Sequence, residues 1–69
     1  MEIPYELLDT ELWTQVAEDQ FNCAELNLKV IITRDDEFEL RGIQDDDFVF
    51  KSPIWSEISY KILEDTGNR

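Results

Sequence analysis

The sequence contains no histidine, and that absence removes much of the chemistry on which enzymes and metal sites depend. Nucleophilic Ser-His and Cys-His pairs need an imidazole base, and histidine-based metal sites need an imidazole ligand. Cys23 is the single cysteine, so no intrachain disulfide can form, and we expect it to be a small buried side chain. The 2 glycines are too few for a glycine-rich phosphate loop or a dinucleotide fingerprint. We therefore expect a protein that is not an enzyme and binds no cofactor.

Long apolar runs and a basic surface are missing as well. Val30-Ile31-Ile32 is as long as any purely apolar stretch in the sequence, whereas a membrane-spanning helix needs roughly 20 apolar residues. The first residues show neither the basic start nor the apolar run of a secretory signal. Lysine and arginine total 6 against 17 aspartates and glutamates, and this net charge of −11 argues against direct binding to nucleic acid or to a membrane. We expect a cytoplasmic protein.

The residues that are present indicate a folded domain. Although 33% of the 69 residues are charged, 42% are hydrophobic and 12% are aromatic. A disordered acidic tail would be poor in aromatic and β-branched residues. A chain of this length forms one small domain at most, so residues 1–69 are expected to share a single thin core.

The first third of the chain has the spacing of an α-helix. Largely apolar side chains recur at i, i+1, i+4, i+5, i+8 and i+9, namely at Leu12, Trp13, Val16, Ala17, Gln20 and Phe21. Pro4 suits a first helical position, and Asp9 or Thr10 could cap a later start. We predict a helix from about Tyr5 or Thr10 to about Phe21, with Trp13 in the core.

Three later segments alternate with a period of two, as half-buried strands do. They are residues 26–32, 37–41 and 47–51, and the polar breaks between them predict an antiparallel meander. Turns centred on Asp35 and Gln44 place apolar side chains on one face, in the pairs Ile32–Phe38, Val30–Leu40, Leu40–Phe48 and Phe38–Phe50. The other face then carries the favourable charged pairs Glu37–Lys51 and Arg41–Asp47. One misfit remains, because Lys29 faces Arg41, although Asp47 could serve both cations.

A second helix is expected at the end of the chain. Ser52-Pro53 supplies an N-cap followed by a proline, Ile54, Ile58 and Ile62 are spaced by four, and Gly67 is a natural stop. The fold class that follows is α+β. We predict a two-layer α-β-β-β-α domain with a three-stranded antiparallel meander and both helices on one face.

The excess of acidic residues is larger than solubility alone requires. A net charge of −11 exceeds the magnitude of about 2 to 8 that is recommended for a small soluble domain. A metal site is not favoured, because neither Asp35-Asp36-Glu37 nor Asp45-Asp46-Asp47 has the spacing of a calcium loop. Aspartates also favour turns, because their side chains bond nearby backbone amides. Rows of carboxylates can, however, enter sites that are shaped for phosphates.

These observations predict a non-catalytic inhibitor that mimics nucleic acid and fills the basic groove of a DNA- or RNA-binding protein. Compact acidic proteins of phages and mobile elements, such as anti-CRISPR and anti-restriction proteins, resemble this chain in size and charge alone. The contact residues that we predict are carboxylates of the two turns, supported by two on the first helix: Asp35, Asp36, Glu37, Asp45, Asp46, Asp47, Glu18 and Asp19.

Two other classes of protein stay open. An immunity or antitoxin-type protein, or a small accessory subunit, would bind one specific basic partner, and its charge would steer the encounter. Such an interface favours a tryptophan anchor, for which Trp55 is a better candidate than Trp13. A structural subunit with no inhibitory role is the third class. If the chain forms a homodimer, the outer sheet face or an edge strand would be the interface.

Overall fold

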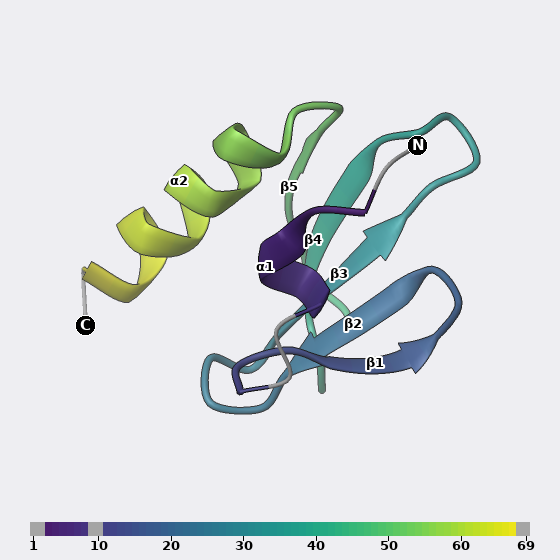
Figure 1. Ribbon diagram of the computed structural model, residues 1–69. Helices are drawn as coiled ribbons and strands as arrows, with labels where there is room; N and C mark the ends of the chain where they lie inside the picture. Colours follow the sequence, from purple (N-terminus) through teal and green to yellow (C-terminus); the bar gives the residue numbers. More distant parts are fainter. Residues whose placement is uncertain (1–2, 9–10, 68–69) are drawn as a thin grey trace.

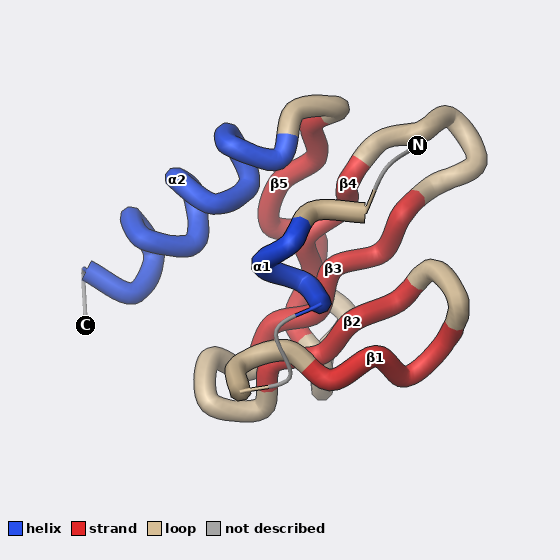
Figure 2. Tube along the Cα trace, in the orientation of Figure 1, coloured by secondary structure: helices blue, strands red, loops and turns tan. Residues whose placement is uncertain are grey.

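The computed structural model describes residues 3–8 and 11–67, which form one five-stranded antiparallel sheet and two helices (Figure 1). The strands lie in the sheet in chain order, so each pairs with the next as a meander (Figure 2). The α+β class is thereby confirmed. The elements are α1 (Tyr5–Leu8), β1 (Thr14–Ala17), β2 (Gln20–Cys23), β3 (Leu28–Ile32), β4 (Phe38–Gly42), β5 (Phe48–Ser52) and α2 (Trp55–Gly67).

The region in which we expected one long helix holds a short helix and a hairpin. Helix α1 ends at Leu8, and the expected cap positions Asp9 and Thr10 lie outside the described residues. Strands β1 and β2 follow, and they are joined by a tight turn at Glu18-Asp19. The prediction of a helix reaching Phe21 is therefore wrong, and the sheet has five strands instead of the expected three.

Burial explains why the helical spacing was misleading. Trp13 and Phe21 are only 3% and 0% exposed, whereas Leu12 and Val16 from the same expected stripe are 43% and 51% exposed. The apolar residues of this segment have helical spacing in the sequence, but they do not share one buried face in the structure. β-Branched and aromatic residues, such as Thr14, Val16 and Phe21, favour strands over helices.

The expected register is confirmed between β3 and β4. Ile32 lies opposite Phe38, Val30 opposite Leu40 and Lys29 opposite Arg41. Alternate side chains of both strands therefore enter the core, as the period of two predicted.

Between β4 and β5 the expected register is wrong. Leu40 pairs with Phe50 and Arg41 with Phe48, and the ladder shifts irregularly between Leu40 and Arg41. The turn is wider than a turn centred on Gln44, because the Gly42 amide donates to the Asp47 carbonyl at 3.0 Å. At the Leu40–Phe50 pair the register differs from the expected one by two residues, so Phe50 keeps its core-facing side. Across the bulge, Phe48 pairs one residue away from its expected partner, so it moves to the open face.

Both helices pack against the same face of the sheet. Leu7 of α1 and Ile58 and Ile62 of α2 join one buried cluster with strand side chains that include Phe21, Val30 and Leu40. Trp13 and Cys23 also lie in this cluster, as expected. The two-layer arrangement with both helices on one face is therefore confirmed, and the described helices leave the opposite face of the sheet open (Figure 1).

Helix α2 starts from a buried serine. The Oγ of Ser52 accepts a hydrogen bond from the Ile54 amide at 3.1 Å and donates one to Oε1 of Glu57 at 2.8 Å. Ser52 thus caps the entry to the helix as predicted, although the helix itself begins at Trp55. No helix within residues 3–8 and 11–67 is long and apolar enough to span a membrane.

Candidate functional site

The meander sorts the acidic turns to two ends of the sheet. In an antiparallel meander successive hairpin turns alternate between the ends, so the β1–β2 and β3–β4 turns lie together and the β4–β5 turn lies opposite. We call the first group the hollow end, which contains Glu18, Asp19, Asp35, Asp36 and Glu37. We call the second group the far end, which contains Asp45, Asp46 and Asp47. The eight predicted contact residues therefore form two separate groups, and Glu18 and Asp19 belong to a hairpin turn, not to a helix.

The β3–β4 turn is held by its own backbone and by Thr33. The Asp36 amide donates to the Thr33 carbonyl at 3.1 Å, and the Thr33 amide donates to the Glu37 carbonyl at 2.8 Å. The Glu37 amide also donates to Oγ1 of Thr33 at 3.2 Å. Asp36 has a φ of 60°, a left-handed conformation that aspartate tolerates better than most residues. The tight turn fixes where its carboxylates are presented.

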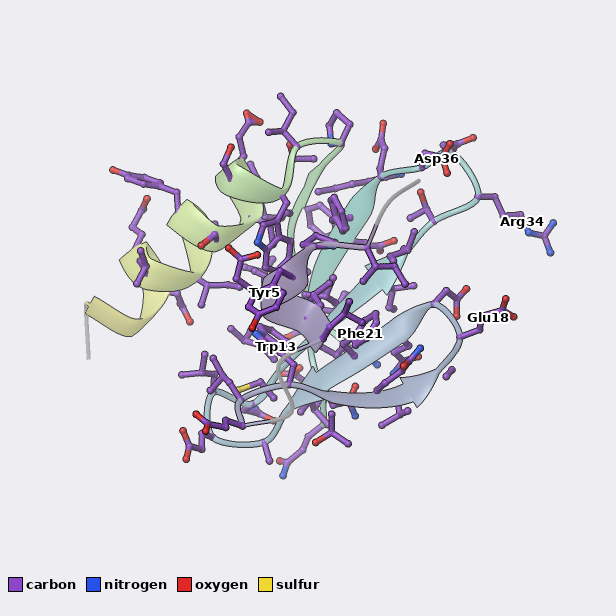
Figure 3. The ribbon with its side chains drawn as sticks, viewed as in Figure 1. Tyr5, Trp13, Glu18, Phe21, Arg34 and Asp36 are labelled. Atoms are coloured by element: carbon purple, nitrogen blue, oxygen red, sulfur yellow. The ribbon has the colours of Figure 1, made fainter. Side chains whose placement is uncertain are left out.

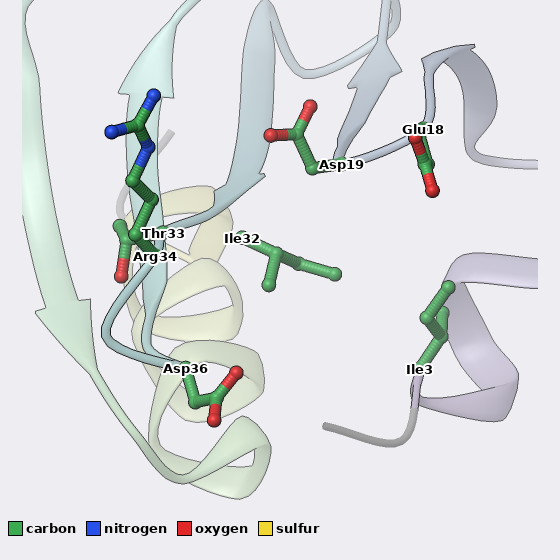
Figure 4. Close-up of a pocket in the computed structure, with 7 residues that line it drawn as sticks. All are labelled: Ile3, Glu18, Asp19, Ile32, Thr33, Arg34 and Asp36. Carbon is green, nitrogen blue, oxygen red and sulfur yellow. The ribbon is translucent and has the colours of Figure 1, made fainter.

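A hollow of about 390 Å³ lies between the two turns of this end (Figure 4). The Ile32 amide donates to the Asp19 carbonyl at 2.8 Å, which ties the β1–β2 turn to the end of β3. Ile3 and Ile32 are half-buried and pack against the core, so they give the hollow an apolar floor. Carboxylates and one guanidinium stand around it, and the described residues that line it are Ile3, Glu18, Asp19, Ile32, Thr33, Arg34 and Asp36.

Several charges at the hollow end are not neutralised. Among residues 3–8 and 11–67, Glu18, Asp19 and Asp35 take part in no ion pair. Within the same ranges Arg34 pairs with none of its acidic neighbours. Glu18, Arg34 and Asp36 lie at the same side of the molecule (Figure 3). This end therefore presents negative charge that an outside cation can meet.

At the far end, the carboxylates of Asp45 and Asp46 are engaged within the fold. Asp46 forms an ion pair with Lys29 at 2.7 Å, and Lys29 lowers the pKa of Asp46 through that hydrogen bond and its charge. Oδ1 of Asp45 accepts from the Asp47 amide at 3.2 Å, and the same carboxylate lies where a Cβ on Gly42 would be. These contacts shape the turn, which is the structural role that aspartates often have in turns.

The open face of the sheet carries cations that are already paired. Lys29, Arg41 and Lys51 project from β3, β4 and β5, respectively, to the face away from the helices. Arg41 bonds Glu39 at 2.5 Å and lies over the Phe48 ring at 5.7 Å from its centre. The expected Glu37–Lys51 pair forms at 3.6 Å, although Lys51 is directly opposite Glu39. The expected Arg41–Asp47 pairing is wrong, because Arg41 faces Phe48 and Arg41 Nη1 donates to the Asp46 carbonyl.

The sequence did not reveal the hollow itself. Glu18 and Asp36 were both expected contact residues, but assigning Glu18 to a helix separated it from the β3–β4 turn. The alternation of Gln20 and Asn22 with the buried Phe21 and Cys23 was the signal that could have identified the hairpin. Had β1 and β2 been recognised, the alternation of turns would have put both acidic turns at one end.

In the described residues no group of three or more histidine, cysteine or carboxylate side chains is arranged to hold a metal ion. No protein-family model matches the chain, and no curated protein and no solved structure is significantly similar to it. The arrangement of charge and the hollow are therefore the basis for a functional proposal.

Proposed function

We propose that this chain is a non-catalytic acidic binding protein that occupies the basic, nucleic-acid-binding groove of a partner protein. The observation that carries this proposal is the hollow end, where Glu18, Asp19 and Asp35 form no ion pair with any other residue that the structure describes. The net charge of −11 adds a long-range attraction toward a basic surface. Carboxylates that accept charge-assisted hydrogen bonds from arginine and lysine take the place of phosphates.

The distribution of cations supports the same proposal. Lys29, Arg41 and Lys51 project from the open sheet face, where they pair with Asp46, Glu39 and Glu37, respectively. Their ion pairs therefore neutralise Glu37 at the hollow end but not Glu18, Asp19 or Asp35. A basic groove that approaches this end meets more carboxylates than cations, because Glu18, Asp19 and Asp36 line the hollow together with Arg34. Electrostatic steering of this kind raises association rates and falls with ionic strength. We extend the proposal to an anti-defence role in the cytoplasm of a host cell, with a restriction or CRISPR nuclease as the kind of target.

The alternative, a lock for one specific basic partner, has weaker support. Trp13 is buried and Trp55 packs against Phe38, so neither tryptophan projects as the anchor that such an interface favours. Among the described residues, the aromatic side chains exposed enough to serve in that role are Tyr5, Tyr60 and Phe48, at 81%, 69% and 56% exposure. The capture experiment below separates the two proposals.

The test is capture from nuclease-treated bacterial lysate on the immobilised protein, with elution by rising salt and, separately, by duplex DNA. We expect nucleic-acid-binding proteins that are released by moderate salt and displaced by DNA. A partner that resists both would favour the specific lock. A column that retains no nucleic-acid-binding protein would overturn the mimicry proposal.

Matched variants locate the contact. The triple variant Glu18→Gln, Asp19→Asn, Asp35→Asn should lose most of the captured protein, because it removes the unpaired carboxylates of the hollow end. The control Glu6→Gln, Glu25→Gln, Glu64→Gln removes the same amount of charge from exposed positions elsewhere and should retain it. Equal losses in both variants would show that net charge, not the hollow end, governs binding.

A further inference from the structure

We propose that the hollow receives one arginine side chain of the partner's groove. Its aliphatic stem would lie on Ile3 and Ile32, and its guanidinium would meet the carboxylates around the rim. This inference rests on the proposed function, because it specifies what the hollow end recognises.

The shape of the hollow suits a long side chain with an apolar stem. Its volume of about 390 Å³ lies near the lower end of the roughly 300–1,000 Å³ range of small-molecule sites. Ile3 and Ile32 enter it from opposite sides, the first from the segment before α1 and the second from the end of β3 (Figure 4). Arginine buries its methylene stem on apolar surface and keeps its charged head near water. An apolar floor under a charged rim matches both parts of that side chain.

The charges around the hollow favour a guanidinium over an ammonium group. Glu18 and Asp19 approach from the β1–β2 turn as two separate acceptors, and Asp36 of the β3–β4 turn adds negative charge on the other side of the space (Figure 4). A planar guanidinium carries five donors in a fixed fork and can bond acceptors in more than one direction. An ammonium group is a compact point charge that holds its water more strongly. Arginine therefore uses this arrangement more fully than lysine.

Arg34 provides an internal check on the inference. Among the described residues that line the hollow it is the one cation, and within residues 3–8 and 11–67 it forms no ion pair. Its positive charge at the rim opposes the entry of a second guanidinium. Replacing Arg34 with glutamine should therefore strengthen binding of an arginine probe. The control Lys61→Gln removes the same charge from α2, beside Glu64, and should change binding less.

The experiment is an NMR titration of the folded chain with N-acetyl-L-arginine amide as the probe and N-acetyl-L-lysine amide for comparison. We expect saturable shifts at the methyl groups of Ile3 and Ile32 and at the amides of Glu18 and Asp19, stronger with the arginine probe. The double variant Glu18→Gln, Asp19→Asn should weaken arginine binding by about five- to tenfold, as expected for the loss of exposed charged contacts. The control Glu25→Gln, Asp47→Asn should weaken it by less than about twofold, because only screened long-range charge changes.

Each other outcome has a definite meaning. Shifts spread over both ends of the sheet, with equal weakening in the two double variants, would overturn the arginine site and leave the capture result intact. Equal binding of the lysine and arginine probes would overturn the preference for a guanidinium. Specific binding of the probe together with an empty capture column would instead count against the proposed function.

Discussion

At the scale of single residues, aspartates that look alike in the sequence have different roles. Asp46 and Asp35 each lie in an acidic triplet at a turn, and both were expected to contact a partner. Asp46 forms an ion pair with Lys29 of β3, whereas among the described residues Asp35 takes part in no ion pair. The difference arises from the open sheet face, which brings Lys29 within 2.7 Å of Asp46. Sequence shows how many charges a turn holds, but it does not show which are neutralised.

The pair of Asp46 and Lys29 leads to a prediction about pH. The hydrogen bond and the charge of Lys29, aided by the charge of Arg41, hold the pKa of Asp46 below its ordinary value. Because the folded pKa lies below the unfolded one, the charged carboxylate of Asp46 stabilises the fold at a pH above its ordinary pKa. This stabilisation is lost as the pH falls through the lowered pKa. NMR titration of the Asp46 carboxyl carbon measures the shift directly.

The matched variants for that titration are Lys29→Gln and Lys61→Gln. The first removes the partner of Asp46 and should raise its pKa toward the ordinary value, while the second removes an equal charge from α2 and should leave it unchanged. If Lys29→Gln leaves the titration of Asp46 where it was, the pair is not formed in solution.

At the scale of elements, the strands with alternating buried side chains were predicted correctly from the sequence, and the fully exposed strand was not. Strands β3 and β4 alternate between buried and half-buried side chains, and their alternation identified both the strands and their register. All four residues of β1 are exposed, so this strand offers no alternation to detect. Residue type predicted the two turns that contain Asp35-Asp36 and Asp45-Asp46-Asp47, and the alternating strands placed these turns at opposite ends of the sheet. The hollow could not be predicted, because it is formed by the β1–β2 hairpin and by Ile3, which belongs to no periodic pattern.

The hairpin and the helix make opposite predictions for Val16. In a helix Val16 and Phe21 would share one buried stripe, but in the hairpin Phe21 is buried and Val16 is 51% exposed. We expect Phe21→Leu to lower the free energy of unfolding by about 1–2 kcal/mol through loss of core packing. Val16→Ala should change it by less than about 0.5 kcal/mol. Urea denaturation of both variants measures the two effects, and a large loss for Val16→Ala would contradict the exposed edge strand.

At the scale of the whole molecule, the proposed function and the stability of the fold oppose each other. A net charge of −11 on 69 residues repels itself in the compact state, and the small core has little stability in reserve. The structure lessens this repulsion on the open face, where Arg41 bonds Glu39 and Lys51 bonds Glu37. It does not lessen it for Glu18 and Asp19, which in the described parts of the chain have no ion pair.

The last prediction follows from that contrast. Raising the salt concentration from about 0.01 M to about 1 M shortens the screening length from roughly 30 Å to roughly 3 Å, so the protein should unfold at a higher temperature. A gain of about 1 kcal/mol corresponds to roughly 4–8 °C for a domain of this size. At low salt, Glu18→Gln with Asp19→Asn should raise the melting temperature, because it lessens the net repulsion and breaks no ion pair among the described residues. Glu37→Gln with Glu39→Gln removes as much charge but leaves Lys51 and Arg41 unpaired, so it should lower the melting temperature. Thermal unfolding followed by circular dichroism gives both signs. If both variants shifted the melting temperature in the same direction, the carboxylates of Glu18 and Asp19 would destabilise the fold no more than those of Glu37 and Glu39. The stability of the fold would then give no support to a role for Glu18 and Asp19 in binding a partner.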